Sequence, residues 1–180
     1  MIRNKIKKML EGLPDEELQE IFWTVEAVRK NYLFKKNLQD KGVVVSEIYE
    51  GFEQIVAAWD CAFAHNISEE TKNVIHYDQF KWHIFSYEKK RCLKEEAARH
   101  AFDELKKDEI YIMYQSRPYI YLYENAQDVR ASDFDSEQDI YIFDKKFTWT
   151  YIHTHESSCG PYLYKTTQFE CDFKGDGNIL

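Results

Sequence analysis

The links between the strand-like segments in the second half of the chain are short, and this limits the fold more than any other feature. After residue 81 the helical repeat gives way to runs rich in aromatic and β-branched residues, which are typical of strands. The expected strands cover residues 82–87, 110–114, 119–123, 139–143, 147–153 and 162–164. Residues 115–118 and 144–146 are too few for the crossover of about a dozen residues that neighbouring parallel strands require. The sequence therefore predicts an α+β fold with a mainly antiparallel sheet in the C-terminal two thirds.

Three helices are expected to pack with this sheet. The first covers residues 52–63, where apolar side chains recur every three or four positions. A short helix is expected after Ser68, a residue type that caps helix N-termini. A third is expected over residues 95–107, whose alanines would let it lie close to a sheet. Residues 43–45 are three consecutive valines, and we expect them to form a short buried strand.

An amphipathic helix is expected over residues 14–36, because Pro14 and the three acidic residues after it suit a helix N-terminus. Its apolar stripe consists of Leu18, Ile21, Phe22, Val25 and Val28. A polar stretch at residues 35–42 follows, so we expect an N-terminal helical arm at 1–41, an α+β domain at 42–165 and a C-terminal tail at 166–180. The stripe needs a partner, either the body of the domain or a second copy, which would give a homodimer through the N-terminal helix.

The charge of the chain is uneven. The 180 residues have a net charge of -8, and the 24 basic residues are outnumbered by 32 acidic ones. Between residues 124 and 144 there are seven carboxylates, opposed by Arg130 alone. Such a field repels phosphate backbones, so we expect no nucleic acid as a partner and favour a basic protein.

A membrane partner and export are not expected either. The longest stretch without a formal charge, residues 147–155, has nine residues, far fewer than the ~20 that a membrane-spanning helix needs. No long apolar run follows the basic N-terminus, which does not fit a secretory signal. The chain is therefore expected in the cytoplasm.

Tyrosine is abundant in the chain, and tyrosine is enriched at the centres of protein interfaces. Strand alternation places Tyr119, Tyr121 and Tyr123 on one face. The acidic residues that follow would complete a docking surface for a basic partner; the candidates are Asp133, Asp135, Glu137 and Asp139. The leading hypothesis is a small protein-binding module, and its most specific form is a neutraliser of a basic toxin or nuclease.

One group of residues suggests chemistry instead. His153 and His155 have metal-ligand spacing on a strand, and Glu156 and Cys159 follow closely, so a zinc site with His153, His155 and Cys159 as ligands is one reading. A catalytic Cys159 thiolate activated by His155, with Glu156 beside them, is another. A purely structural role explains the same residues, and His83 is expected to be a packed core histidine. Common enzyme signatures are absent, so the sequence leans away from an enzyme.

Several uncommon strings occur in one order along the chain. They begin at Trp82 (WHIFSYEKK), Ala98 (ARHAF), Asp139 (DIYIFDKKFTWTY), Thr154 (THE) and Cys159 (CGPY). Together they resemble one bacterial family, an uncharacterised domain of unknown function. The resemblance covers about residues 45–164 and leaves the N-terminal arm and the tail outside. It implies a small cytoplasmic protein of Gram-positive-type bacteria, with no established activity, cofactor or substrate to transfer to these residues.

Overall fold

The computed structural model describes residues 1–156 and 158–166. They divide into two compact units, one made of Met1–Asp40 and one that begins at Lys41. Most of the expected C-terminal tail, residues 167–180, lies outside the described residues.

The first unit contains two helices. α1 covers Ile2–Leu10, which the sequence analysis did not predict, and α2 covers Asp15–Asp40. The helix expected over residues 14–36 is confirmed, but α2 continues through most of the stretch expected to be a polar link. Lys36 Nζ lies 2.6 Å from a carboxylate oxygen of Asp40, and an i,i+4 ion pair of this kind supports the last helical turn. None of the helices in the described part of the chain has the length and apolar character needed to cross a membrane.

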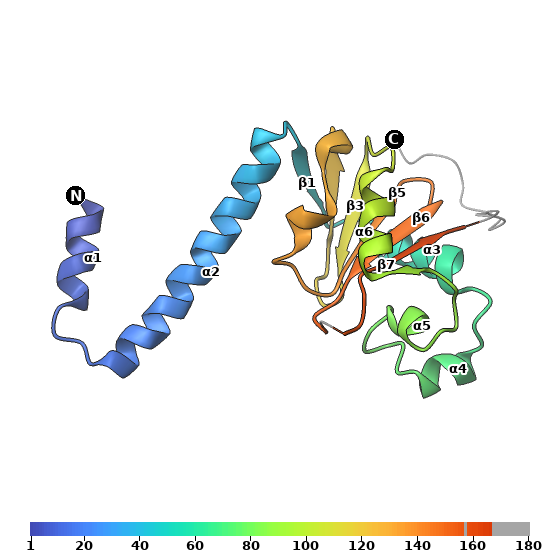
Figure 1. Cartoon of the computed structure of the whole chain (residues 1–180), viewed down its shortest axis with the longest axis horizontal. Coiled ribbons are helices and arrows are strands. Elements are labelled where there is room, and N and C mark those ends of the chain that lie inside the picture. The colour runs from blue at the N-terminus through green and yellow to red at the C-terminus, as the bar shows by residue number, and fades with distance from the viewer. Residues whose placement is uncertain (157, 167–180) are drawn as a thin grey trace. The chain divides into compact units, whose positions relative to one another are not determined.

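The second unit is built on a seven-stranded sheet with the order β1-β4-β3-β5-β6-β7-β2 (Figure 1). Its strands are β1 (Val44–Ile48), β2 (Leu93–Lys94), β3 (Ile110–Tyr114), β4 (Ile120–Glu124), β5 (Ile140–Asp144), β6 (Trp149–His153) and β7 (Tyr162–Lys165). Every pair of neighbouring strands is antiparallel. The predicted α+β fold with an antiparallel sheet is therefore confirmed, as is the β3–β4 hairpin.

Helices lie on both faces of this sheet (Figure 1). They are α3 (Phe52–Ala64), α4 (Glu69–Val74), α5 (His83–Ser86) and α6 (Glu95–Asp103), with the 3-10 turns η1 (Ala126–Asp128) and η2 (Ala131–Phe134). The helix expected over residues 52–63 is confirmed. Ser68 caps α4 as expected, since its hydroxyl accepts a hydrogen bond from the backbone N–H of Thr71. α6 ends at Asp103, earlier than the expected helix.

α3 and α5 pack on one face of the sheet. Trp59 of α3 is fully buried, with its ring centroid 5.3 Å from that of Tyr141 on β5. Its indole Nε1 donates a hydrogen bond to the hydroxyl of Thr150 on β6. Phe85 of α5 stacks on Tyr162 of β7 with a centroid separation of 5.8 Å. These contacts join α3 and α5 to β5, β6 and β7 in one hydrophobic core.

α6 and η2 pack on the other face. Phe102 of α6 is fully buried and lies 4.4 Å, centroid to centroid, from Tyr151 of β6. Its ring also contacts Trp149 of β6 and Phe134 of η2. The odd-numbered aromatic residues of β6 therefore share one face, as strand alternation predicts.

The β5–β6 connection is longer than the sequence suggests. The Asp144 carboxylate accepts hydrogen bonds from the backbone N–H groups of Thr148 and Trp149, at 2.6 and 3.2 Å. These bonds close a loop that sets the register of the two strands, with Ile140 opposite His153. The start of β5 is thereby brought next to the end of β6, where the candidate site lies.

Two local predictions are wrong. Residues 82–87 contain the short helix α5 instead of a strand: Phe85 is buried while Tyr87 is 50% exposed, which strand alternation does not allow. The strand at residues 43–45 exists as β1, but it lies at the sheet edge, and Val44 and Val45 are exposed. The strand β2 was not predicted.

Lys107 should make the stability of the fold depend on pH. Its side chain is buried, and Nζ donates to the backbone carbonyls of Phe102 and Leu105 at 2.7 and 3.2 Å. Burial lowers the pKa of Lys107 to about 8, against its ordinary value of 10.5. Between these two values the unfolded chain holds a proton that the folded chain has lost, so this contribution to stability rises with pH there and is constant below pH 8.

The measurement is the free energy of unfolding in urea for the wild type and for Lys107→Met. We expect the wild type to gain about 1 kcal/mol relative to the variant between pH 7 and pH 9. The comparison cancels the titration of tyrosines, which the two proteins share. A difference that stays constant between the two pH values would show that Lys107 keeps its ordinary pKa.

Candidate functional site

A pocket of about 610 Å³ lies at one end of the sheet. Its walls come from three connections: residues 79–80 before α5, residues 114–117 of the β3–β4 hairpin and residues 136–139 before β5. Because these segments are far apart in sequence, the pocket is a product of the strand order. Residues expected to bind a partner and residues expected to do chemistry both lie at or beside it.

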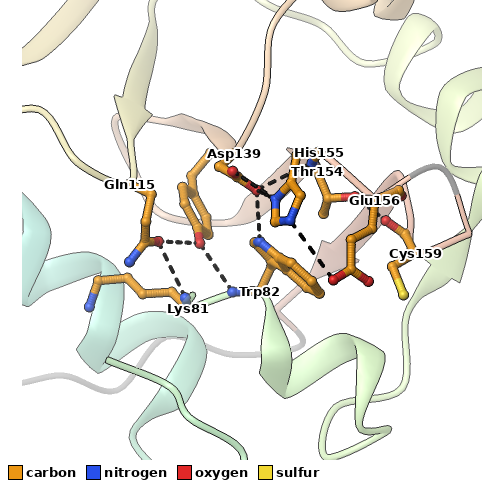
Figure 2. Close-up of polar contacts among 9 residues, drawn as sticks. Lys81, Trp82, Gln115, Asp139, Thr154, His155, Glu156 and Cys159 are labelled. Carbon is orange, nitrogen blue, oxygen red and sulfur yellow. Dashed lines mark hydrogen bonds and ion pairs between the residues drawn. The ribbon is translucent and has the colours of Figure 1, made fainter. Parts of the chain in front are cut away.

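Asp139 holds His155 and Trp82 together beside this pocket (Figure 2). Its carboxylate accepts a hydrogen bond from Trp82 Nε1 at 3.0 Å and from the backbone N–H of His155 at 3.3 Å. Both carboxylate oxygens lie 2.9 Å from His155 Nδ1. A carboxylate can only accept, so Nδ1 carries the proton. Asp139 has a φ of +50°, a conformation that Asp tolerates better than most residues.

The imidazole of His155 is held by ring contacts as well. Its centroid is 5.0 Å from that of Phe80, a residue of the pocket wall, and 6.0 Å from that of Trp82. The side chain of His155 keeps 35% of its exposure, against 19% for Asp139. The Asp139–His155 pair therefore combines a fixed imidazole with access from solvent, the arrangement that general acid–base chemistry requires.

A chain of hydrogen bonds extends from Trp82 to the opposite pocket wall (Figure 2). The hydroxyl of Tyr141 accepts from the backbone N–H of Trp82 and donates to Gln115 Oε1, at 3.1 and 2.5 Å. Gln115 Oε1 also accepts from the backbone N–H of Lys81. Burial raises the pKa of Tyr141 well above its ordinary value, so this hydroxyl stays neutral and keeps both roles.

Glu156 lies between His155 and Cys159. Its carboxylate is 3.9 Å from His155 Nε2 and is also hydrogen-bonded to the Cys159 thiol. This hydrogen bond, together with burial, raises the pKa of Cys159 above its ordinary value. The thiol is thus held in its protonated form, and the arrangement suits proton transfer by His155 better than attack by a thiolate.

This arrangement predicts slow alkylation of Cys159. The substitution Glu156→Gln removes the charged acceptor, so the thiolate becomes easier to form. We expect iodoacetamide to modify Cys159 of this variant several-fold faster, because the fraction of thiolate rises as the pKa of the thiol falls. Peptide mass spectrometry against time measures the rate. Cys92 is the internal control, because burial raises its pKa to about 11 independently of Glu156; an unchanged rate at Cys159 would contradict the proposed hydrogen bond.

His153 has different neighbours from His155. Burial lowers the pKa of His153, against the opposing influence of Asp135 and of a hydrogen bond to the backbone of Glu137. Its Nδ1 is buried without a hydrogen-bond partner among the described residues. Within residues 1–156 and 158–166, no group of three or more His, Cys, Asp or Glu side chains is arranged to hold a metal ion. The zinc set of His153, His155 and Cys159 stays a prediction from the sequence.

The four acidic residues expected to meet a partner all have partners within the chain. The pairs are Asp133 with Lys41, Asp135 with Arg99, Glu137 with the Tyr114 hydroxyl, and Asp139 with His155. Glu137 and Asp139 line the pocket, whereas Asp133 and Asp135 do not. These carboxylates therefore stabilise the loop around the pocket, and they add to the negative field of the surface without being free ligands.

Aromatic residues and one arginine form a continuous surface beside the pocket. We name it the Tyr–Arg surface; it consists of Tyr49, Tyr114, Arg117, Tyr119 and Tyr121. The Arg117 guanidinium lies 4.1 Å from the ring centroid of Tyr114 and donates to the hydroxyls of Tyr119 and Tyr121 at 3.1 and 2.8 Å. Burial and a hydrogen bond to Tyr119 raise the pKa of Tyr121 to about 12, so its hydroxyl stays neutral.

The expected tyrosines, Tyr119, Tyr121 and Tyr123, differ in exposure, and Tyr49 joins them from the segment after β1. Tyr49 is 56% exposed, and its ring lies 5.0 Å from that of Tyr119, centroid to centroid. Tyr119 and Tyr121 are partly exposed, but Tyr123 is buried at 2%. Tyr123 therefore lies beside Tyr121 on the same face of β4, with ring centroids 6.3 Å apart, but it is covered and does not belong to the Tyr–Arg surface.

Arg117 and the pairing of Asp139 with His155 were not predicted from the sequence. Arg117 sits in a short hairpin link that gave a turn signal but no signal for binding. The Asp139–His155 pair depends on strand register, which spacing alone does not supply. The four strings that begin at Trp82, Asp139, Thr154 and Cys159 do indicate this site. Their first residues, or the residues next to these, lie together in the folded chain (Figure 2).

Comparisons with known proteins give one match. A family model described as a domain of unknown function, DUF4275, matches residues 14–163. The match begins at the start of α2, so the long helix of the arm belongs to the family region, although the resemblance seen in the sequence starts only near residue 45. No curated protein and no solved structure matches the chain. Because the model covers most of the sequence, the chain belongs to the DUF4275 family, whose function is unknown.

Proposed function

We propose that this chain is a protein-binding module that docks its partner on the Tyr–Arg surface and the adjoining pocket. One observation supports this most directly: the Arg117 guanidinium is held by one tyrosine ring and two tyrosine hydroxyls while the residue itself remains exposed. Tyrosine and arginine are the residues enriched at interface hot spots. Here they are also pre-ordered, which lowers the entropy lost on binding.

The charge of the chain favours a basic partner. Its formal net charge is -8. The carboxylates nearest the pocket are paired within the chain, but they still count toward this negative charge. A field of this sign accelerates the approach of a positively charged protein and weakens with added salt. Neutralisation of a basic toxin or nuclease is the most specific form of this proposal.

The test is a pull-down from the source cells that compares the partners retained by the wild type and by the double variant Arg117→Ala, Tyr121→Ala. Loss of two hot-spot residues should weaken binding by at least about 2 kcal/mol, or roughly 30-fold in Kd. The matched control is Arg91→Ala, Tyr87→Ala, since Arg91 and Tyr87 are exposed residues outside the pocket. A partner retained equally by both double variants would exclude this surface as the docking site.

Reversing the charge of the four acidic residues is a poorer test. Asp133 and Asp135 have ion-pair partners in Lys41 and Arg99, at 2.5 and 2.7 Å. Lysine at either position would set two cations side by side and disturb the loop itself. Salt dependence of the association rate for the wild type is the better probe of a basic partner, with faster association at low salt expected.

A second candidate function is acid–base catalysis by His155. The specific observation in its favour is the Asp139–His155 hydrogen bond, which fixes the proton on Nδ1 and leaves Nε2 to accept one. The neighbouring Phe80 connects the imidazole to the pocket, where a small substrate could lie. In this proposal Cys159 has no nucleophilic role, because its thiol is held protonated.

A screen of ester, phosphoester and amide substrates tests the catalytic candidate. Any turnover by the wild type should fall by about 100-fold or more in His155→Gln, the usual contribution of a general base. His100→Gln is the matched control, because His100 is an exposed histidine of α6. Turnover that survives in His155→Gln would place the activity elsewhere.

A further inference from the structure

The N-terminal unit lacks a hydrophobic core of its own. Among residues 1–40, all of which the structure describes, Leu38 is the only buried one. α1 has no buried residue, and α1 and α2 form an open V in Figure 1. Most of the stability of a helix in a protein comes from packing of its apolar face. A helix as long as α2, about 39 Å at 1.5 Å per residue, therefore needs a partner along much of its length.

The face that needs covering is an apolar stripe along α2. At helical spacing, Phe22, Val25, Val28 and Tyr32 follow one another on one side, continuing from Leu18 and Ile21. The exposed fractions of Phe22, Val25, Val28 and Tyr32 are 52%, 56%, 66% and 62%. Leu18, Val25 and Tyr32 are seven residues apart, and Ile21 and Val28 are also seven apart. This is the heptad spacing of helices that pack along one another.

The charges beside this stripe reverse sign along the helix. Asp15 and Glu17 lie on opposite sides of its first turns, and Lys35 and Lys36 follow at its C-terminal end, where Lys36 also pairs with Asp40. If two such helices run in opposite directions and cross near Val25, Glu17 of each lies near Lys35 of the other. If they run in the same direction, each flank of the stripe faces the opposite flank of the partner, so Glu17 lies near Asp15 and Lys35 lies near Lys36. Only the antiparallel arrangement joins opposite charges on both sides of the crossing.

We propose that two copies of this chain form a homodimer in which their α2 helices pack antiparallel through the apolar stripe. The partner that covers the stripe is a second copy of the chain. When two α2 helices run antiparallel, the acidic start of each lies against the basic end of the other. The rest of the chain, residues 42–180, has a negative net charge, with 15 basic and 25 acidic residues. An acidic body fits the basic half of α2 but repels the half that carries Asp15 and Glu17.

Charge reversal in the full-length chain tests both the dimer and its direction. Sedimentation equilibrium should show a dimer for the wild type and a dimer about 10-fold weaker for Glu17→Lys and for Lys35→Glu. The double variant Glu17→Lys, Lys35→Glu should recover the wild-type affinity, since the opposite charges face each other again. A parallel dimer predicts tighter association of the single variants, because Glu17→Lys would lie near Asp15, and Lys35→Glu near Lys36, of the other chain.

Two matched controls lie on the same helix. Glu16→Lys changes the same first turn as Glu17→Lys, and Lys30→Glu changes a basic residue near Lys35, but both positions point away from the stripe by the helical repeat. Neither control should change the dimer affinity. Circular dichroism of each variant checks that α2 remains helical, and recovery in the double variant separates loss of pairing from loss of folding.

Cross-linking gives an independent measurement of direction. A short bismaleimide should join two Val25→Cys chains at the crossing. Two Leu18→Cys chains should not be joined, because in an antiparallel pair their positions are separated by roughly 21 Å along the axis. Mixing Leu18→Cys with Tyr32→Cys should restore the product. A monomer at all concentrations, or a Leu18–Leu18 product, would overturn the proposal; a monomer with protected α2 would indicate docking on its own body.

Discussion

Replacing Trp59 with alanine is expected to lower the free energy of unfolding by about 3–5 kcal/mol, the usual result for a buried tryptophan or phenylalanine. The substitution removes the ring contacts of Trp59 with Phe63 and Tyr141. It also leaves the fully buried hydroxyl of Thr150 without its indole donor. Since whole domains are stable by only about 5–15 kcal/mol, the variant should be close to unfolding at room temperature.

Trp23→Ala is the matched control for this substitution. Trp23 is 63% exposed and lies on α2 away from the apolar stripe, so its replacement should change stability by no more than about 0.5 kcal/mol. Urea denaturation followed by far-ultraviolet circular dichroism compares the two variants without relying on tryptophan fluorescence. Effects of similar size would mean that α3 does not pack on the sheet as described.

Asp139→Ala should produce the second large effect, about 2–4 kcal/mol. It leaves the indole N–H of Trp82, a residue only 1% exposed, without an acceptor, and it frees the ring of His155. An unsatisfied buried donor alone costs about 1–3 kcal/mol. Asp139→Asn retains one side-chain oxygen as an acceptor, so we expect a smaller loss from it.

Asp135→Ala is the control for a carboxylate of the same loop. The side chain of Asp135 is 54% exposed in its ion pair with Arg99, and such pairs contribute about 0–1 kcal/mol. Urea denaturation gives both values, and the indole N–H resonance of Trp82 should shift in Asp139→Ala and stay in place in Asp135→Ala. If the two variants were equally stable, Asp139 would not organise the site.

Several elements of the fold could be predicted from sequence because local signals agree with the tertiary structure. In α3 the apolar positions that repeat helically are the ones that face the sheet, as Trp59 and Phe63 show. In the β3–β4 hairpin the link is short enough to leave antiparallel pairing as the only geometry. Both predictions rest on periodicity and chain length, which do not depend on distant residues.

Residues 82–87 were misassigned because tertiary contacts decide their structure. Their aromatic and β-branched side chains favour a strand by propensity. In the folded chain the backbone N–H of Trp82 instead donates to the Tyr141 hydroxyl, and Phe85 packs on Tyr162. These two contacts hold a four-residue helix against the sheet. The contacting residues lie 59 and 77 positions further along the chain, so no local sequence pattern predicts them.

The Asp139–His155 pair escaped prediction because of loop length. A tight turn at residues 144–146 would set Asp139 opposite residue 151. The side chain of Asp144 instead binds the backbone of Thr148 and Trp149, so the hairpin closes later and Ile140 pairs with His153. One carboxylate in a turn thus moves Asp139 next to His155.

The two edges of the sheet differ in what they can join. β2 has two residues, too few to guide another strand, whereas β1 has five and in the described sheet pairs with β4 on one side only. Strand addition to this sheet can therefore take place along β1 but not along β2. Two chains that joined edge to edge through β1 would leave no usable edge for a third. Misassembly by this route should stop at pairs, because a growing fibre requires an open edge at both ends of every unit.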